Sequence, residues 1–91
     1  MATVTLTVRD DAGGWICDVR IASTATTSHR VRVTRAERER FGGGDVTDLV
    51  RRSIEFLLAR EENTSILREF SLSTIERYFP EYQGVIAAPR G

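Results

Sequence analysis

The sequence predicts an α+β domain in which one long helix and short helices pack on one face of a three-stranded antiparallel meander. Apolar and polar residues alternate in three segments within residues 3–33, which is typical of strands that are buried on one face. Apolar residues then recur at steps of three and four within residues 46–61, which is typical of an amphipathic helix. At 91 residues, the chain has the length of one domain with a modest core.

The strands are expected over residues 3–9, 15–22 and 29–33. In the first segment valine and leucine alternate with threonine and arginine, a composition that favours a half-buried strand. A short turn containing glycines follows it, which predicts an antiparallel hairpin with the second segment. If the three strands are neighbours, the outer face of the sheet carries four arginines: Arg9, Arg20, Arg30 and Arg32.

Two helices are expected to cover the other face. Thr34 and Glu37 have the spacing of a capping box, in which each side chain bonds the other residue's backbone amide, so a short helix should run to about Phe41. Three glycines end it, and Asp45 should cap the long helix over 46–61.

The C-terminal third is expected to add short helices. Residues 65–70, SILREF, are assigned as helical. Ser73 to Glu76 is a second capping box and should start another helix, which Pro80 ends near Phe79. We therefore expect a single domain over 1–82, followed by a mobile tail over 83–91.

No constellation for catalysis is visible. The chain has one cysteine and one histidine. Cys17 falls on an apolar strand face, which predicts an inert core thiol, and His29 is expected to be a satisfied or exposed residue at the sheet edge. No pair of Cys or His has zinc spacing, and the carboxylates are scattered among arginines. We therefore expect no enzyme activity, catalytic residue, metal or cofactor.

The composition also limits the cellular compartment and the classes of binding partner that we expect. Thirteen basic residues, all arginine, balance thirteen acidic ones, which argues against strong attraction of the whole molecule to nucleic acid but not against a local basic patch. No apolar run approaches the length of a membrane span, and the N-terminus lacks the pattern of a secretory signal. A cytoplasmic protein without a membrane partner is expected, and the single cysteine fits a reducing compartment.

Residues 48–82 resemble the C-terminal part of a family of small, uncharacterised bacterial proteins. The matching pattern is FLL-RE … SIL-EF-LS-I-RYFPEY, carried here by Phe56 to Leu58, Arg60-Glu61, Ser65 to Leu67, Glu69-Phe70, Leu72-Ser73, Ile75 and Arg77 to Tyr82. The resemblance implies a bacterial source. It implies no established activity and assigns no functional residue.

The aromatic segment 70–82 allows two interpretations. It forms the lid of the core, or it exposes aromatic side chains to a partner. We expect the lid, with an interface at its rim and at the edge of the long helix, formed by Phe56, Tyr78 and Tyr82. The leading hypothesis is a small bacterial interaction or regulatory protein that binds a protein partner or itself as a homodimer. The alternative is an antitoxin-like regulator that contacts nucleic acid through the four arginines.

Overall fold

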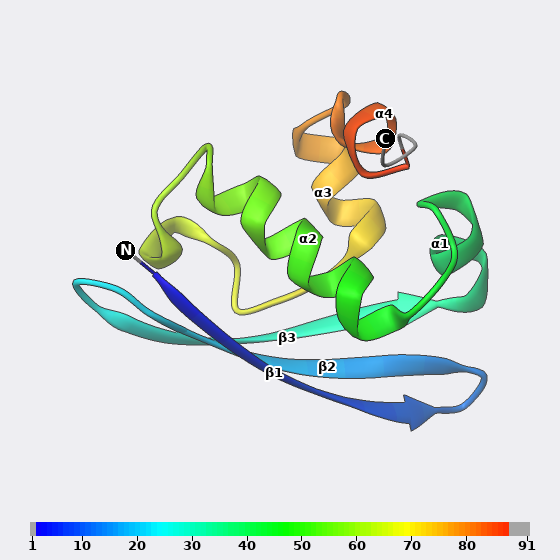
Figure 1. Ribbon diagram of the computed structural model, residues 1–91, viewed down its shortest axis with the longest axis horizontal. Coiled ribbons are helices and arrows are strands. Elements are labelled where there is room, and N and C mark those ends of the chain that lie inside the picture. The colour runs from blue at the N-terminus through cyan, green and yellow to red at the C-terminus, as the bar shows by residue number, and fades with distance from the viewer. Residues whose placement is uncertain (1, 88–91) are drawn as a thin grey trace.

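The computed structural model describes residues 2–87 and has an α+β fold with a four-stranded sheet in the order β1-β2-β3-β4. The strands are β1 (Thr3–Asp11), β2 (Gly14–Ala22), β3 (Thr26–Thr34) and β4 (Glu69–Ser71). The helices are α1 (Arg35–Arg40), α2 (Val46–Leu58), α3 (Leu72–Tyr78) and α4 (Tyr82–Ile86), with a short 3-10 helix η1 (Asn63–Ser65). The helices lie together above one face of the sheet, and the opposite face is open (Figure 1).

The meander of β1, β2 and β3 is antiparallel, as the alternation predicted. Ala12 and Gly13 form the first turn with φ of 41° and 86°, the left-handed pair that a two-residue hairpin turn requires. The register runs from Thr3 opposite Ala22 to Asp11 opposite Gly14. This register places the alternating valines and leucine of β1 toward the helices and its threonines on the open face.

The prediction of three strands is wrong, because β4 adds a fourth and pairs parallel to β3. Its register joins Arg30 to Glu69 and Arg32 to Ser71. The segment 65–70 was expected to be helical, but the free edge of β3 satisfies its backbone groups instead. Phe70 then lies beside Val31 and is buried in the core, which favours the extended conformation over local helix propensity.

Most helix ends follow the sequence signals. Thr34 and Glu37 form the predicted capping box of α1, and Asp45 accepts from the amide of Thr47 at the start of α2. The start of α3 differs from the prediction, because Ser71 and Thr74 form its capping box. Ser73 instead gives both its amide and its hydroxyl to Glu37 of α1.

An aromatic cluster packs between the helices. The ring of Tyr82 meets Phe41 edge-to-face at 4.9 Å and Phe56 at 5.2 Å between ring centroids. Phe79 meets Phe56 in the same geometry at 5.8 Å. These separations are those that aromatic pairs prefer, so the cluster joins α1, α2 and α4 in one core.

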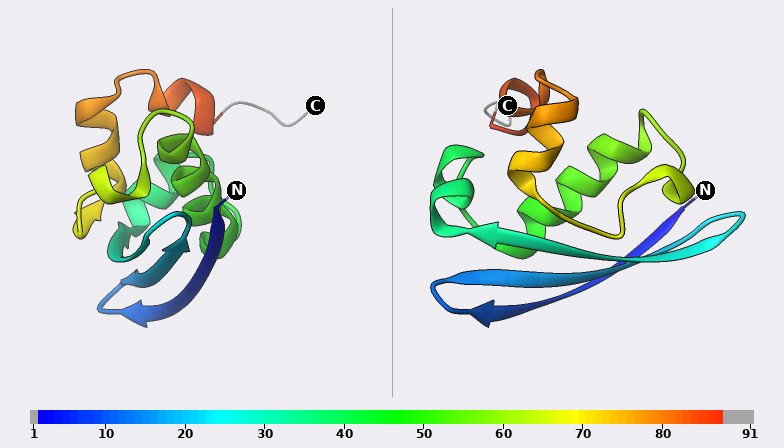
Figure 2. Two further views of the ribbon diagram at one scale, coloured as in Figure 1. Left: turned by 90° about the vertical axis from the view of Figure 1, so that its left-hand side faces the viewer. Right: turned by 180° about the vertical axis from the view of Figure 1, so that it is seen from behind.

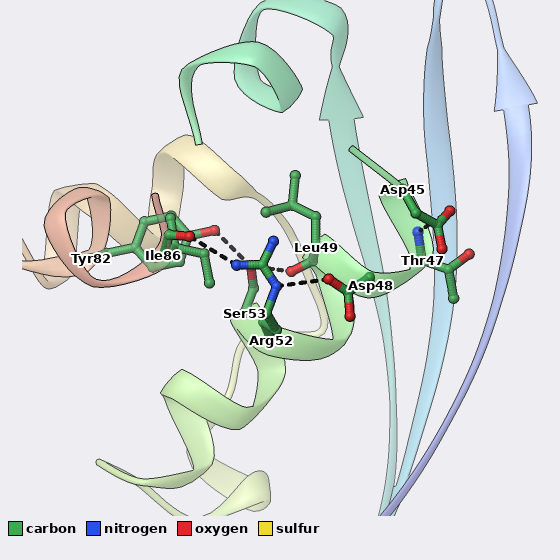
Figure 3. A network of polar contacts seen from close by, with 8 residues as sticks. All are labelled: Asp45, Thr47, Asp48, Leu49, Arg52, Ser53, Tyr82 and Ile86. Atoms are coloured by element: carbon green, nitrogen blue, oxygen red, sulfur yellow. Dashed lines mark hydrogen bonds and ion pairs between the residues drawn. The ribbon is translucent and has the colours of Figure 1, made fainter. Parts of the chain in front are cut away.

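Helix α4 crosses the predicted domain boundary after residue 82. Its last residue, Ile86, is buried, and the Ile86 carbonyl accepts from the guanidinium of Arg52 at 2.8 Å (Figure 3). The segment 83–86 therefore belongs to the packed domain. The remainder of the predicted tail, residues 88–91, lies outside the described residues.

Candidate protein interface

Tyr78 is the aromatic residue that the segment 70–82 leaves at the surface. It ends α3, whose Leu72 and Ile75 face the core. The Tyr78 side chain lies on the other side of this short helix and is 65% exposed. Tyrosine with an exposed ring is typical of protein interfaces, because it offers apolar area and a hydroxyl at a small cost in conformational entropy.

Tyr78 borders an apolar groove of about 320 Å³ between α2, α3 and the segment 65–68. Leu67 forms part of the lining and is 47% exposed. The other apolar side chains that line the groove are Leu57, Ile66, Phe70, Ile75 and Phe79. A concave apolar surface with an exposed leucine and tyrosine is suited to receive apolar side chains of another chain.

Backbone contacts hold the segment 65–68 in place beside the sheet. The carbonyl of Leu67 lies 2.7 Å from Nδ1 of His29, and the amide of Arg30 donates to the carbonyl of Arg68 at 2.6 Å. The main chain that follows the Leu67 side chain, from the Leu67 carbonyl to the Arg68 carbonyl, is thus fixed to β3. The groove is a preformed feature of the fold, which lowers the entropic cost of binding.

Two of the three predicted interface residues lie in the core rather than at the surface. Phe56 is 5% exposed and Tyr82 is fully buried. The Tyr82 hydroxyl lies 2.6 Å from Oγ of Ser53, which itself donates to the carbonyl of Leu49 (Figure 3). Tyr82 is therefore the donor of this pair, and burial raises its pKa to about 12. Neither side chain can contact a partner of the folded domain directly.

Leu67 is the groove residue that the sequence reasoning missed. The segment 65–70 was assigned as a helix, in which Leu67 has no distinct role. Its exposure follows from the pairing of β4 with β3, a contact between distant segments. Local periodicity carries no signal for such a contact.

The four predicted arginines do lie on the open face of the sheet. Arg9 and Arg32 flank Ile16 in one cross-strand row. Arg30 lies in the next row, where it bonds Asp18 at 3.1 Å and stands opposite Glu69 of β4. Arg20 lies one row further along, between Thr5 and Ser28. The face therefore carries four arginines and three carboxylates, the third being Asp11 at the end of β1, and one arginine is already paired.

Cys17 and His29, the cysteine and the histidine of the chain, are both buried and have structural roles. Cys17 is fully buried, and burial together with the charge of Asp18 raises its pKa to about 11, so the thiol stays protonated at neutral pH. His29 is 5% exposed and both ring nitrogens have partners, the Leu67 carbonyl and the hydroxyl of Thr27. Within residues 2–87, no group of three or more His, Cys, Asp or Glu is placed to hold a metal ion.

Comparison with family models, curated proteins and solved structures finds no match. The bacterial source implied by the segment 48–82 therefore stays a prediction. No helix of the described part of the chain is long and apolar enough to cross a membrane.

Proposed function

We propose that this chain is a small, non-enzymatic interaction or regulatory protein that acts by binding another protein chain. The observation that carries the proposal is the preformed apolar groove with Leu67 and Tyr78 exposed beside it. An apolar segment of a protein partner is the occupant that such a lining fits, because its burial removes the exposed leucine and tyrosine from water. Glu61 also lines the groove and offers a negative charge to a basic residue beside that segment.

The first test is affinity capture from a bacterial lysate, with and without nuclease, read by mass spectrometry and by nucleic-acid staining. The proposal predicts a protein that is retained after nuclease treatment and is little affected by moderate salt. Loss of all captured protein after nuclease treatment contradicts it, since the capture would then run through nucleic acid.

A second candidate function is a nucleic-acid-associated regulator, and the open face supports it. Arg9, Arg20 and Arg32 are exposed there, and within the described residues no carboxylate pairs with them. Exposed guanidinium groups beside threonines on an uncovered sheet suit contacts with phosphates. Asp11, Asp18 and Glu69 on the same face oppose this role, which is why we place it second.

The two functions differ in how they respond to salt and to loss of arginine. Binding through phosphate contacts falls steeply with salt concentration. In a mobility-shift assay, R20A/R32A should abolish binding if the arginine face is used. The control R51A/R77A removes two exposed arginines from helices α2 and α3 and should bind as the wild type does. Equal binding by both variants excludes the arginine face.

A further inference from the structure

Strand β1 leaves one edge of the sheet open. In the order β1-β2-β3-β4 its only neighbour in the described chain is β2, and it stands at the outside of the sheet (Figure 2). The strand is nine residues long, from Thr3 to Asp11. A long edge strand offers a row of backbone groups that can pair with another strand.

The hairpin turn determines which backbone groups face outward. In a two-residue hairpin the closing residues, here Asp11 and Gly14, exchange both of their hydrogen bonds. Pairs along an antiparallel ladder then alternate, so Thr3, Thr5, Thr7 and Arg9 bond to β2. The amides and carbonyls of Val4, Leu6 and Val8 face the open edge. The guanidinium of Arg51 confirms this parity, because it donates to the Val4 carbonyl at 3.2 Å.

The same three residues carry the apolar side chains of the strand. Val4, Leu6 and Val8 are only partly buried, although they pack against the core. Natural edge strands are commonly protected by proline, by lysine or by a charge that points inward. Residues 3–8 contain none of these. Arg51 covers the Val4 carbonyl, and Asp10, which has the helix-facing parity, places a charge near the far end of the strand.

The sequence of β1 is self-complementary. Residues 4–8 read VTLTV, a palindrome centred on Leu6. A two-fold symmetric interface requires one patch to match itself. An antiparallel copy centred on Leu6 places Leu6 opposite Leu6, Val4 opposite Val8 and Thr5 opposite Thr7.

We propose that β1 pairs with β1 of a second copy of this chain in this register, giving a dimer with one continuous eight-stranded sheet. The outward amides and carbonyls of Val4, Leu6 and Val8 then bond reciprocally across the edge. Arg9 faces Thr3 of the second copy and Asp10 faces Ala2, so no like charges stand opposite each other. The amide of Val8 of the second copy replaces Arg51 at the Val4 carbonyl.

This inference deepens the proposed function, on which it rests, by naming a second copy as one partner and β1 as the surface. It does not use the groove beside Tyr78. The two surfaces therefore give separate results when they are changed separately.

A charge exchange at positions 5 and 7 tests the pairing. Both threonines are exposed on the open face, but Thr5 stands opposite Arg20 and Thr7 opposite Asp18 within the chain, so urea denaturation first establishes that both variants are folded. T5K/T7K places like charges opposite each other across the dimer axis, and T5E/T7K places opposite charges there. In sedimentation equilibrium we expect a wild-type dimer, a dissociation constant raised roughly tenfold or more in T5K/T7K, and a retained dimer in T5E/T7K. Equal dissociation by the two variants overturns the proposal.

Disulfide trapping tests the register. Thr5 and Thr7 form non-hydrogen-bonded pairs across the proposed axis, where Cα atoms approach to about 4.5 Å, within reach of a disulfide. A mixture of T5C and T7C should form the mixed disulfide. A register centred on Thr5 would cross-link T5C with itself. A register centred on Thr7 would cross-link T7C with itself. Predominant cross-linking of either variant with itself overturns the register centred on Leu6, and the buried native Cys17 does not compete.

The remaining outcomes separate this inference from the proposed function. A wild-type protein that stays monomeric up to about 0.1 mM overturns the pairing, while capture of a protein partner after nuclease treatment would still support the function. A dimer that persists in T5K/T7K but dissociates in L67S/Y78S also overturns the β1 pairing and places self-association at the groove.

Discussion

The carboxylate of Glu37 in α1 accepts hydrogen bonds from both the amide and the hydroxyl of Ser73, 36 positions further along the chain. Its other oxygen accepts from the amide of Thr34 at 2.8 Å. One side chain thus satisfies backbone donors at the starts of two helices, α1 and α3. Because α3 forms one wall of the groove, this contact fixes that wall to helix α1.

Replacing Glu37 should therefore destabilise the whole domain. Glu37 is 7% exposed, and E37A leaves the amides of Thr34 and Ser73 without their charged acceptor. We expect a loss of about 2 kcal/mol in the free energy of unfolding, measured by urea denaturation. E39Q, at an exposed position of the same helix, is the control and should stay within about 0.5 kcal/mol of the wild type. Equal stability of both variants would show that the network contributes nothing.

The same carboxylate should make the stability depend on pH. Burial favours its protonated form, but hydrogen bonds from Ser73 and Thr34 outweigh burial and hold the pKa of Glu37 below its ordinary value of 4.5. A group whose pKa is lower in the folded state contributes stability above its unfolded pKa and loses that contribution as the pH falls through the folded pKa. The stability difference between wild type and E37Q should therefore shrink as the pH is lowered from 7 toward 3, by urea denaturation at each pH. A constant difference would contradict this assignment.

The Tyr82 hydroxyl offers a test of the aromatic core. Y82F keeps the ring between Phe41 and Phe56 but removes the hydrogen bond to Ser53. We expect a loss of about 1 kcal/mol by thermal or urea unfolding, because Ser53 still donates to the Leu49 carbonyl. The matched control is Y78F, at the exposed tyrosine. We expect it to change the free energy of unfolding little. A larger loss in Y78F than in Y82F would mean that their roles are reversed.

Asn63 closes the end of the β2–β3 hairpin. Its side-chain amide lies 3.0 Å from both the Ala25 carbonyl and the Thr27 hydroxyl, and 3.3 Å from the Ile21 carbonyl. N63A should cost about 1 kcal/mol, because it removes the hydrogen bonds that the side-chain amide donates, while the Ala25 carbonyl still accepts from the amide of Ser23. T64A, at the exposed neighbour, is the control, with no more than about 0.5 kcal/mol expected. Chemical denaturation of both variants decides the point, and equal effects would contradict a structural role for Asn63.

The features that could be predicted from the sequence are those with a local cause. The alternation in β1, β2 and β3 and the periodicity of α2 arise from burial of one face of each element, so they are visible in any short window. The capping box of Thr34 and Glu37 is equally local. The arginines reached the open face because strand parity alone decides the side on which a residue lies.

The predictions that were wrong concern features that depend on contacts between distant segments. Phe70 enters a strand because β3 has a free edge, and Ser73 leaves its expected capping role because Glu37 lies nearby. Phe56 was expected at the edge of α2, but α4 covers it through Tyr82. Of the three residues predicted at an interface, Tyr78 is the exposed one, and the sequence did not single out Leu67. The interface itself stays a prediction.

The measurement that tests the central claim most directly is quantitative capture of a protein partner by three matched proteins after nuclease treatment. These are the wild type, the groove variant L67S/Y78S, and V85S, which changes an exposed apolar residue of α4 outside the groove. Binding through the groove predicts capture by the wild type and V85S and loss of most of it in L67S/Y78S, with all three proteins equally folded. Equal capture by all three would contradict it.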